Sequence, residues 1–187
     1  MSLFRKRSPD TTPFTPVDSE ATDRVLETLE NSDLDPKATL LVGSAALALH
    51  GAVLHTTSGE TRPGDVDLLT TTGLAQDVFA KGSFNGEPVT IKDNGNHKVM
   101  TVLRLDTAPL PIDLITAPLH TMDPAAYDAR LRKRIAAARP IIGMNGYRII
   151  SLDDIIRAQK NNMDEKSRDD LASAYELRAR QQRGRYL

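Results

Sequence analysis

Apolar residues follow two kinds of spacing along this chain. Ala21, Val25 and Leu29 recur every four residues, which predicts a helix over 18–30. Short apolar or alternating runs bounded by Gly, Pro, Asn or Asp predict strands instead. Predicted helices cover 18–30, 45–50, 74–80, 123–138, 151–160 and 164–182, and predicted strands cover 38–42, 65–69, 89–91, 99–105, 112–116 and 147–150. We therefore expect an α/β (α+β) protein with a mixed sheet flanked by helices.

The pattern divides the chain into three parts. Residues 1–16 are rich in Ser, Thr, Pro and Arg and carry no apolar period, so we expect a disordered basic tail. Residues 17–150 hold all the predicted strands and form the expected core. Residues 151–187 form a small helical C-terminal part that we expect to pack on that core. Polar stretches with Gly and Pro at 55–64 and 82–88 are predicted loops, and 93–96 is a predicted hairpin turn.

Composition narrows the classes of function. The 187 residues include 24 Lys and Arg against 25 Asp and Glu, so the whole molecule has little electrostatic attraction for nucleic acid. The absence of Cys excludes disulfides, thiolate zinc sites and cysteine nucleophiles. No apolar run approaches the roughly 18 residues of a membrane span, and the basic N-terminus is not followed by the apolar stretch of a signal peptide. We expect a cytoplasmic protein without a membrane partner.

The acidic residues are strongly biased, with 18 Asp and 7 Glu. Two Asp-x-Asp pairs occur, about as many as chance predicts, so only their context distinguishes them. Asp33 and Asp35 lie in a Pro-containing linker, where Asp is common. Asp65 and Asp67 open an apolar strand, where Asp is disfavoured, and side chains at i and i+2 share one face of a strand. This second pair could hold one or two divalent cations.

Two further features could belong to the same site. Asp113 lies within the apolar segment 112–116, where a carboxylate is either paired with something such as a metal or exposed at a strand edge. Gly43 and Ser44 link a predicted buried strand to a helix start, which is either an ordinary helix start or an anion-binding turn. Together, an anion cradle and three strand carboxylates are what metal-assisted transfer of a nucleotidyl group requires.

The stretches LVGSAALALHG, RPGDVDLLT and PIDLIT resemble the nucleotidyltransferase superfamily that shares the DNA polymerase beta fold. The resemblance is closest to abortive-infection AbiEii-type toxins, and SLDDIIRAQKNNMDEKSRDDL is similar to the C-terminal part of that group. It implies an NTP substrate, Mg²⁺ (or Mn²⁺), and a toxin of a toxin–antitoxin or phage-defence system with a cognate antitoxin protein as partner. The first motif has Ser44 where many members have Gly, and Gly64 stands where Thr is common.

The same resemblance implies roles for particular residues. Asp65 and Asp67 would bind the magnesium ions, and Asp113 would be a third metal ligand or the base for the acceptor hydroxyl. Gly43 and Ser44 would bind the nucleotide phosphates. Lys160 would face the nucleotide, with Asp169 positioning it, although both are also typical of a solvated helix surface. Arg62, just before the acidic strand, is a candidate for triphosphate contact.

The acceptor and the class of function stay open at this stage. Basic clusters at 130–134 and 178–185 favour an RNA acceptor such as the 3′ end of a tRNA, but they equally suit solvated helix faces. One alternative is a non-catalytic nucleotide- or nucleic-acid-binding member of the fold, and another is a small-molecule (antibiotic) nucleotidyltransferase. The four His residues have no zinc-binding spacing, so none is assigned a metal.

Overall fold

A seven-stranded mixed sheet forms the centre of the protein, with the strand order β3-β4-β5-β2-β1-β7-β6. The computed structural model describes residues 12–54, 63–92, 99–117, 123–160 and 165–183. Its strands are β1 (Thr39–Leu41), β2 (Val66–Thr70), β3 (Asn85–Lys92), β4 (Val99–Leu105), β5 (Ile112–Thr116), β6 (Arg139–Pro140) and β7 (Arg148–Ile149). Its helices are α1 (Glu20–Glu30), α2 (Gly43–Leu49), α3 (Thr72–Ala80), α4 (Pro124–Ala137), α5 (Leu152–Gln159) and α6 (Glu165–Arg183). The expected α/β class is confirmed.

Helix starts follow local side-chain chemistry. The Ser19 hydroxyl accepts a hydrogen bond from the Thr22 N–H at the start of α1, and the Asp123 carboxylate does the same for two N–H groups of α4. The Ser151 hydroxyl accepts from the Asp154 N–H at the start of α5. Such caps satisfy backbone donors that have no partner inside the helix, and each contributes about 1 kcal/mol.

The strand that carries the Asp pair lies in the middle of the sheet. β2 pairs antiparallel with β1 on one side and parallel with β5 on the other, and β4 pairs antiparallel with β5. Both β2 and β5 alternate buried and half-buried residues. This alternation places Val66 and Leu68 on the fully buried face and directs Asp67 and Leu69 to the opposite face.

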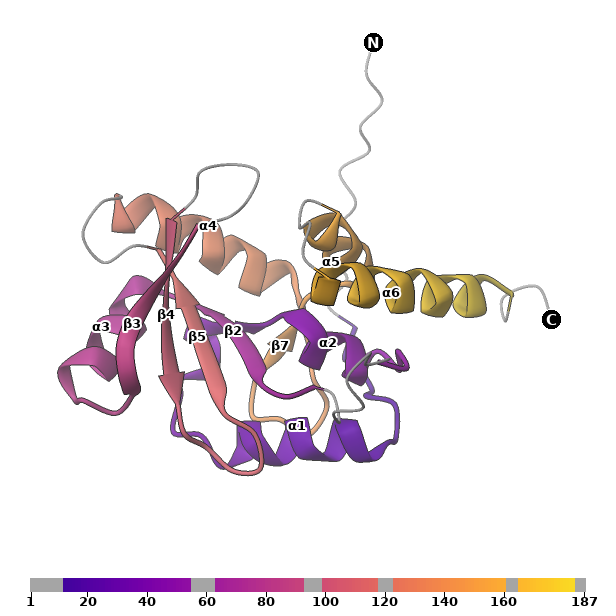
Figure 1. Cartoon of the computed structure of the whole chain (residues 1–187), viewed down its shortest axis with the longest axis horizontal. Helices are drawn as coiled ribbons and strands as arrows, with labels where there is room; N and C mark the ends of the chain where they lie inside the picture. The colour runs from indigo at the N-terminus through magenta and orange to yellow at the C-terminus, as the bar shows by residue number, and fades with distance from the viewer. Residues whose placement is uncertain (1–11, 55–62, 93–98, 118–122, 161–164, 184–187) are drawn as a thin grey trace, which may run out of the picture.

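Helices cover the two faces of the sheet differently (Figure 1). The larger core joins the fully buried sheet face to α1, α2 and α3, and it extends to apolar residues of α5 and α6. A smaller core joins α4 to the other face, where Leu131 and Ile135 pack with Leu40 of β1 and Leu69 of β2. The paired helices α5 and α6 contact α2 beyond the sheet. The sheet face that α4 covers thus has a polar part, which contains Asp67. This part is bordered by α2, α4, α5 and α6.

Two segments differ from the sequence expectation. Strand β3 begins at Asn85, within the predicted loop 82–88, because Pro88 is tolerated in an edge strand that needs fewer N–H donors. The two-residue strand β6 is too short to give a periodic signal. Most of the predicted loop 55–64 and all of the predicted turn 93–96 lie outside the described residues. No helix within the described ranges has the length and apolar character needed to cross a membrane.

The expectation of a disordered tail is wrong for residues 12–16. Phe14 is 6% exposed and forms a parallel bridge with Ile141. Its N–H donates to the Pro140 carbonyl at 2.7 Å, and Arg139 donates to the carbonyls of Thr12 and Pro13. A single aromatic residue therefore anchors this segment, which carries no periodic signal. Residues 1–11 of the predicted tail lie outside the described residues.

The imidazole of His50 packs beneath this segment and supports a prediction about pH. Its Nε2 lies 2.9 Å from the Ile150 carbonyl and its ring contacts Phe14 edge-on. Burial lowers the pKa of His50, against the opposing effect of the Ile150 carbonyl. Because the folded-state pKa of His50 is lowered, its contribution to the free energy of unfolding is complete above the unfolded pKa of about 6.5. This contribution is lost as the pH falls below that value.

We expect the free energy of unfolding of the wild type to approach that of His50→Gln as the pH is lowered from about 7.5 to 5.5, by up to about 1.4 kcal/mol per pH unit. Urea unfolding at several pH values measures this difference. Both proteins retain His55, His97 and His120, so the effects of these residues cancel in the comparison. A difference that does not change with pH would contradict the prediction.

Candidate active site

Three Asp side chains from two neighbouring strands form the centre of the site. Asp67 of β2 and Asp113 of β5 are register partners in a parallel pair, so their side chains lie side by side on the same face. Asp65, two residues before Asp67, projects on this face as well. The side chains of Asp65 and Asp113 are 19% and 17% exposed. The structure thus places the three acids that the sequence singled out on one face of the sheet.

Gly43 provides the space that the Asp67 carboxylate occupies. A Cβ atom built on Gly43 would lie 2.2 Å from Asp67 Oδ2, far below any contact distance, and the Gly43 φ angle is +66°. The Val42 N–H also donates to the Asp67 carbonyl at 3.0 Å, which holds the two segments together. Glycine is therefore required at position 43 for two separate reasons, its backbone conformation and the close approach of a proposed metal ligand.

Arg104 of β4 is the cation that faces the acids from within the sheet. It is the register partner of Asp113, and its Nε lies 3.6 Å from Asp113 Oδ1 while its Nη2 lies 3.8 Å from Asp65 Oδ2. Neighbouring carboxylates of like charge repel each other. Arg104 offsets part of this repulsion. Sequence reasoning overlooked it, although an Arg within the apolar run VLRL was the same kind of signal as Asp113.

A cavity of about 470 Å³ opens beside Asp67, between the sheet and the helices. Asp67, Gly43 and Ser44 line one end of it, and Leu69 and Ile115 of the sheet form an apolar floor. Its remaining walls come from Val42 and Ile150, which directly follow β1 and β7, from α4 and from the C-terminal helices. The cavity is lined by Val42, Gly43, Ser44, Asp67, Leu69, Ile115, Arg134, Ile150, Ile155, Ala158, Gln159, Ser167 and Asp170.

The Ser44 hydroxyl lies in the wall of this cavity and can donate a hydrogen bond. The side chain is 1% exposed, and its Oγ has no hydrogen-bond partner among the described residues. A buried hydroxyl without a partner is costly by about 1–3 kcal/mol, so its presence in a cavity wall points to a ligand that completes its hydrogen bonding.

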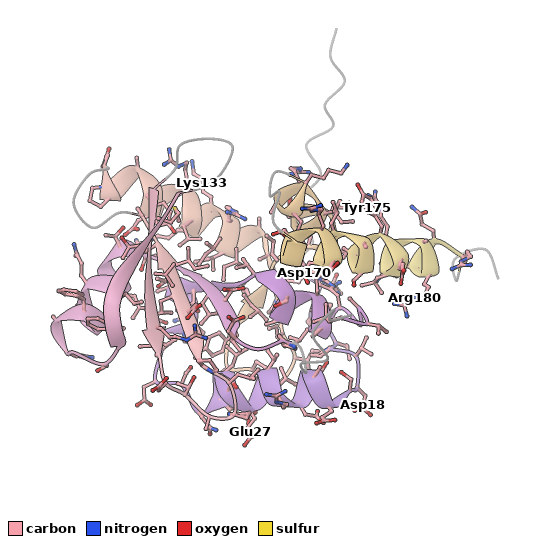
Figure 2. The ribbon with its side chains drawn as sticks, viewed as in Figure 1. Asp18, Glu27, Lys133, Asp170, Tyr175 and Arg180 are labelled. Carbon is pink, nitrogen blue, oxygen red and sulfur yellow. The ribbon has the colours of Figure 1, made fainter. Side chains whose placement is uncertain are left out.

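The C-terminal helices contribute polar residues that differ from those predicted. Asp170 of α6 is 2% exposed, lines the cavity, and accepts a hydrogen bond from Gln159 Nε2 of α5 at 3.5 Å. Figure 2 labels Asp170 in the first part of α6, the helix that contacts α2. The predicted Asp169 is only half-buried and does not line the cavity. Successive helical residues differ in direction by about 100°, which is why neighbouring acids have different surroundings.

Two other predicted residues lie elsewhere. Lys160 is exposed at the C-terminal end of α5, where its Nζ sits 5.6 Å from the centroid of the Tyr175 ring, and it does not line the cavity. This cation–π contact explains its position without a ligand. Arg62 lies outside the described residues.

A second, larger groove of about 1070 Å³ adjoins the cavity. Arg134 and Ile150 line both spaces. Four Arg side chains line the groove, namely Arg134, Arg139, Arg157 and Arg178. Two of them are paired with acids, because Arg157 lies 2.9 Å from Asp154 and Arg178 lies 3.4 Å from Asp153. One residue of each predicted basic cluster, Arg134 of α4 and Arg178 of α6, therefore lines this groove.

The donor set fits a divalent cation that prefers oxygen, such as Mg²⁺ or Mn²⁺. Three carboxylates share one face, Gly43 leaves room for one of them, and no Cys or paired His competes for a softer metal. Among the described residues, however, no three acidic or His side chains are already gathered into a metal-binding group. The contacts of Arg104 with Asp65 and Asp113 are consistent with this separation of the acids, because they direct the two carboxylates toward β4.

Two sequence comparisons find no relative of this chain. No protein-family model matches the chain, and a search of curated proteins finds no match.

Proposed function

We propose that this chain is a Mg²⁺-dependent nucleotidyltransferase, which moves a nucleotidyl group from an NTP to an acceptor hydroxyl. The observation that carries the proposal is the placement of Asp65, Asp67 and Asp113 on one sheet face, with Asp67 against Gly43 and lining a cavity together with the buried Ser44 hydroxyl. The motif resemblance supports the same reaction. It extends the proposal to a toxin of a toxin–antitoxin or phage-defence system.

In this reaction the acceptor oxygen forms a bond to the α-phosphorus of the NTP, the bond from that phosphorus to the bridging oxygen breaks, and pyrophosphate leaves. Mg²⁺ held by the three carboxylates would neutralise the triphosphate and lower the pKa of the attacking hydroxyl. The Ser44 hydroxyl donates to a phosphate oxygen, which satisfies its hydrogen bonding. We assign to Asp113 the acceptance of the proton from the acceptor hydroxyl.

The nucleoside part of the substrate is assigned to the cavity. Its apolar residues Leu69 and Ile115 suit the face of a base or sugar, while Gln159 and Asp170 offer hydrogen-bonding groups in its wall. This division into an acidic end and a mixed apolar and polar chamber matches the two parts of a nucleotide. Asp170 thus takes the place beside the nucleotide that the sequence resemblance assigned to Asp169.

An RNA acceptor, such as the 3′ end of a tRNA, is supported by the adjoining groove. Arg134 and Arg139 approach it from the core, and Arg157 and Arg178 approach it from the C-terminal helices. Guanidinium groups suit the phosphates of a nucleic-acid backbone. Because Arg134 also lines the cavity, a strand held in the groove would have its end next to the proposed nucleotide site.

The proposed function is tested by incubating the protein with each of the four α-labelled NTPs, Mg²⁺ and total tRNA. We expect label to appear in the RNA, to be abolished by EDTA and to be restored by excess Mg²⁺. Label in a small molecule or in the protein itself would keep the reaction but change the acceptor. Binding of RNA that falls with salt but is indifferent to EDTA, with no transfer, would favour a non-catalytic binding module.

A further inference from the structure

Arg104 connects the proposed metal ligands to each other. Its side chain extends from β4 over the neighbouring strand β5, where its Nε and Nη2 face Asp113 Oδ1 and Asp65 Oδ2 at 3.6 and 3.8 Å. One planar guanidinium thus contacts two acids from two different strands. A guanidinium has several donors in a fixed plane, so it can serve both carboxylates at once.

The surroundings of Arg104 allow it to leave these acids. Its side chain is 48% exposed, whereas its neighbours Leu103 and Leu105 are buried in the core. An exposed arginine can rotate into solvent without disturbing that packing. Its distances from the carboxylates also exceed those of a close hydrogen-bonded ion pair, so little binding energy has to be given up.

A divalent cation held by Asp65 and Asp113 would share these two carboxylate groups with Arg104. Cations that share ligand atoms compete, because each reduces the negative potential available to the other. We infer that Arg104 is a built-in counter-ion of the acidic site, a positioning residue that holds Asp65 and Asp113 when no divalent ion is bound and releases them when one binds. This inference rests on the proposed function, because it assumes that these acids are metal ligands.

The test measures Mn²⁺ affinity from the electron paramagnetic resonance signal of free Mn²⁺, with the full-length wild type, Arg104→Gln and Arg132→Gln. Arg132 is exposed on α4, so its replacement removes the same charge away from the acids. We expect the Kd for Mn²⁺ to fall about fivefold in Arg104→Gln, the size expected when an exposed ion pair is removed, and to stay unchanged in Arg132→Gln. The Tm of metal-free Arg104→Gln should fall, and Mn²⁺ should raise it by more than in the wild type.

The outcomes separate this inference from the proposed function. Wild-type binding of Mn²⁺ with equal or weaker binding by Arg104→Gln would overturn the counter-ion role and leave the metal site standing. Absence of Mn²⁺ binding in all three proteins would overturn both. Should Arg104→Gln fail to fold, Arg104→Lys keeps the charge but not the planar donor set, and an intermediate Kd would support the inference while an unchanged or weaker one would oppose it.

Discussion

Asp67→Asn is expected to reduce kcat/KM for nucleotidyl transfer by about 1000-fold or more. The substitution keeps the shape of the side chain but removes the charge that lies against Gly43 and beside Asp113. It also removes one of three neighbouring negative charges, so the Tm should stay the same or rise. Loss of activity without loss of stability is typical of a functional residue that is unfavourable for folding. Transfer of label and thermal unfolding of the same preparations measure the two effects.

The chain contains its own matched control for this experiment. The double variant Asp33→Asn/Asp35→Asn changes the other Asp-x-Asp pair, in which the Asp35 carboxylate accepts a hydrogen bond from the Lys37 N–H, a role that Asn can keep. We expect it to retain wild-type activity, whereas Asp65→Asn/Asp67→Asn should have none. Appreciable transfer by Asp65→Asn/Asp67→Asn, with its label still dependent on Mg²⁺, would exclude this pair as the catalytic centre.

Gly43→Ala is expected to abolish activity while costing only moderate stability. An Ala at a φ of +66° costs about 1–2 kcal/mol. The added methyl group would also lie only 2.2 Å from the present position of Asp67 Oδ2. The carboxylate must therefore turn away from the other two acids. Because a side-chain end can move more easily than a backbone, we expect the second effect to appear mainly in activity. Urea unfolding and the transfer assay measure the two effects separately.

Gly82→Ala separates conformational strain from this steric effect. Gly82 has nearly the same φ angle, +63°, but a Cβ atom there would meet nothing within 4 Å. Both variants should lose a similar part of the free energy of unfolding, and only Gly43→Ala should lose activity and Mn²⁺ binding. Equal activity in the two variants would show that the contact between Gly43 and Asp67 has no part in the reaction.

Local features of the structure follow closely from the sequence. The apolar runs at 99–105 and 112–116 coincide with β4 and β5, and the capping residue Ser151 begins α5 where its Ser-x-x-Asp spacing predicts. These elements depend on interactions within a few residues, which spacing and side-chain chemistry reveal directly. Asp67 and Asp113 were also conspicuous, because a carboxylate in an apolar strand requires a reason.

Other features depended on which distant segments meet. Phe14 is anchored through Ile141 and His50, which are far from it in the sequence. Asp170 lines the cavity, and the neighbouring Asp169 does not, because the packing of α6 against α2 and α5 sets the rotation of the helix. A helix with a weak apolar stripe can be rotated by one residue at little local cost, so its sequence alone does not decide which acid faces inward.

The sequence by itself determined most of the elements, because their apolar spacing is local, and it singled out the three acids and the Gly-Ser turn, because each departs from what its element favours. Only the tertiary structure decided that β2 and β5 are parallel neighbours, with Asp67 opposite Asp113 and Arg104 next in the row. The physical reason is that strand pairing is settled by the packing of the whole core. The alternation within a strand reports which residues share a face, but it carries no information about which strand will lie beside it.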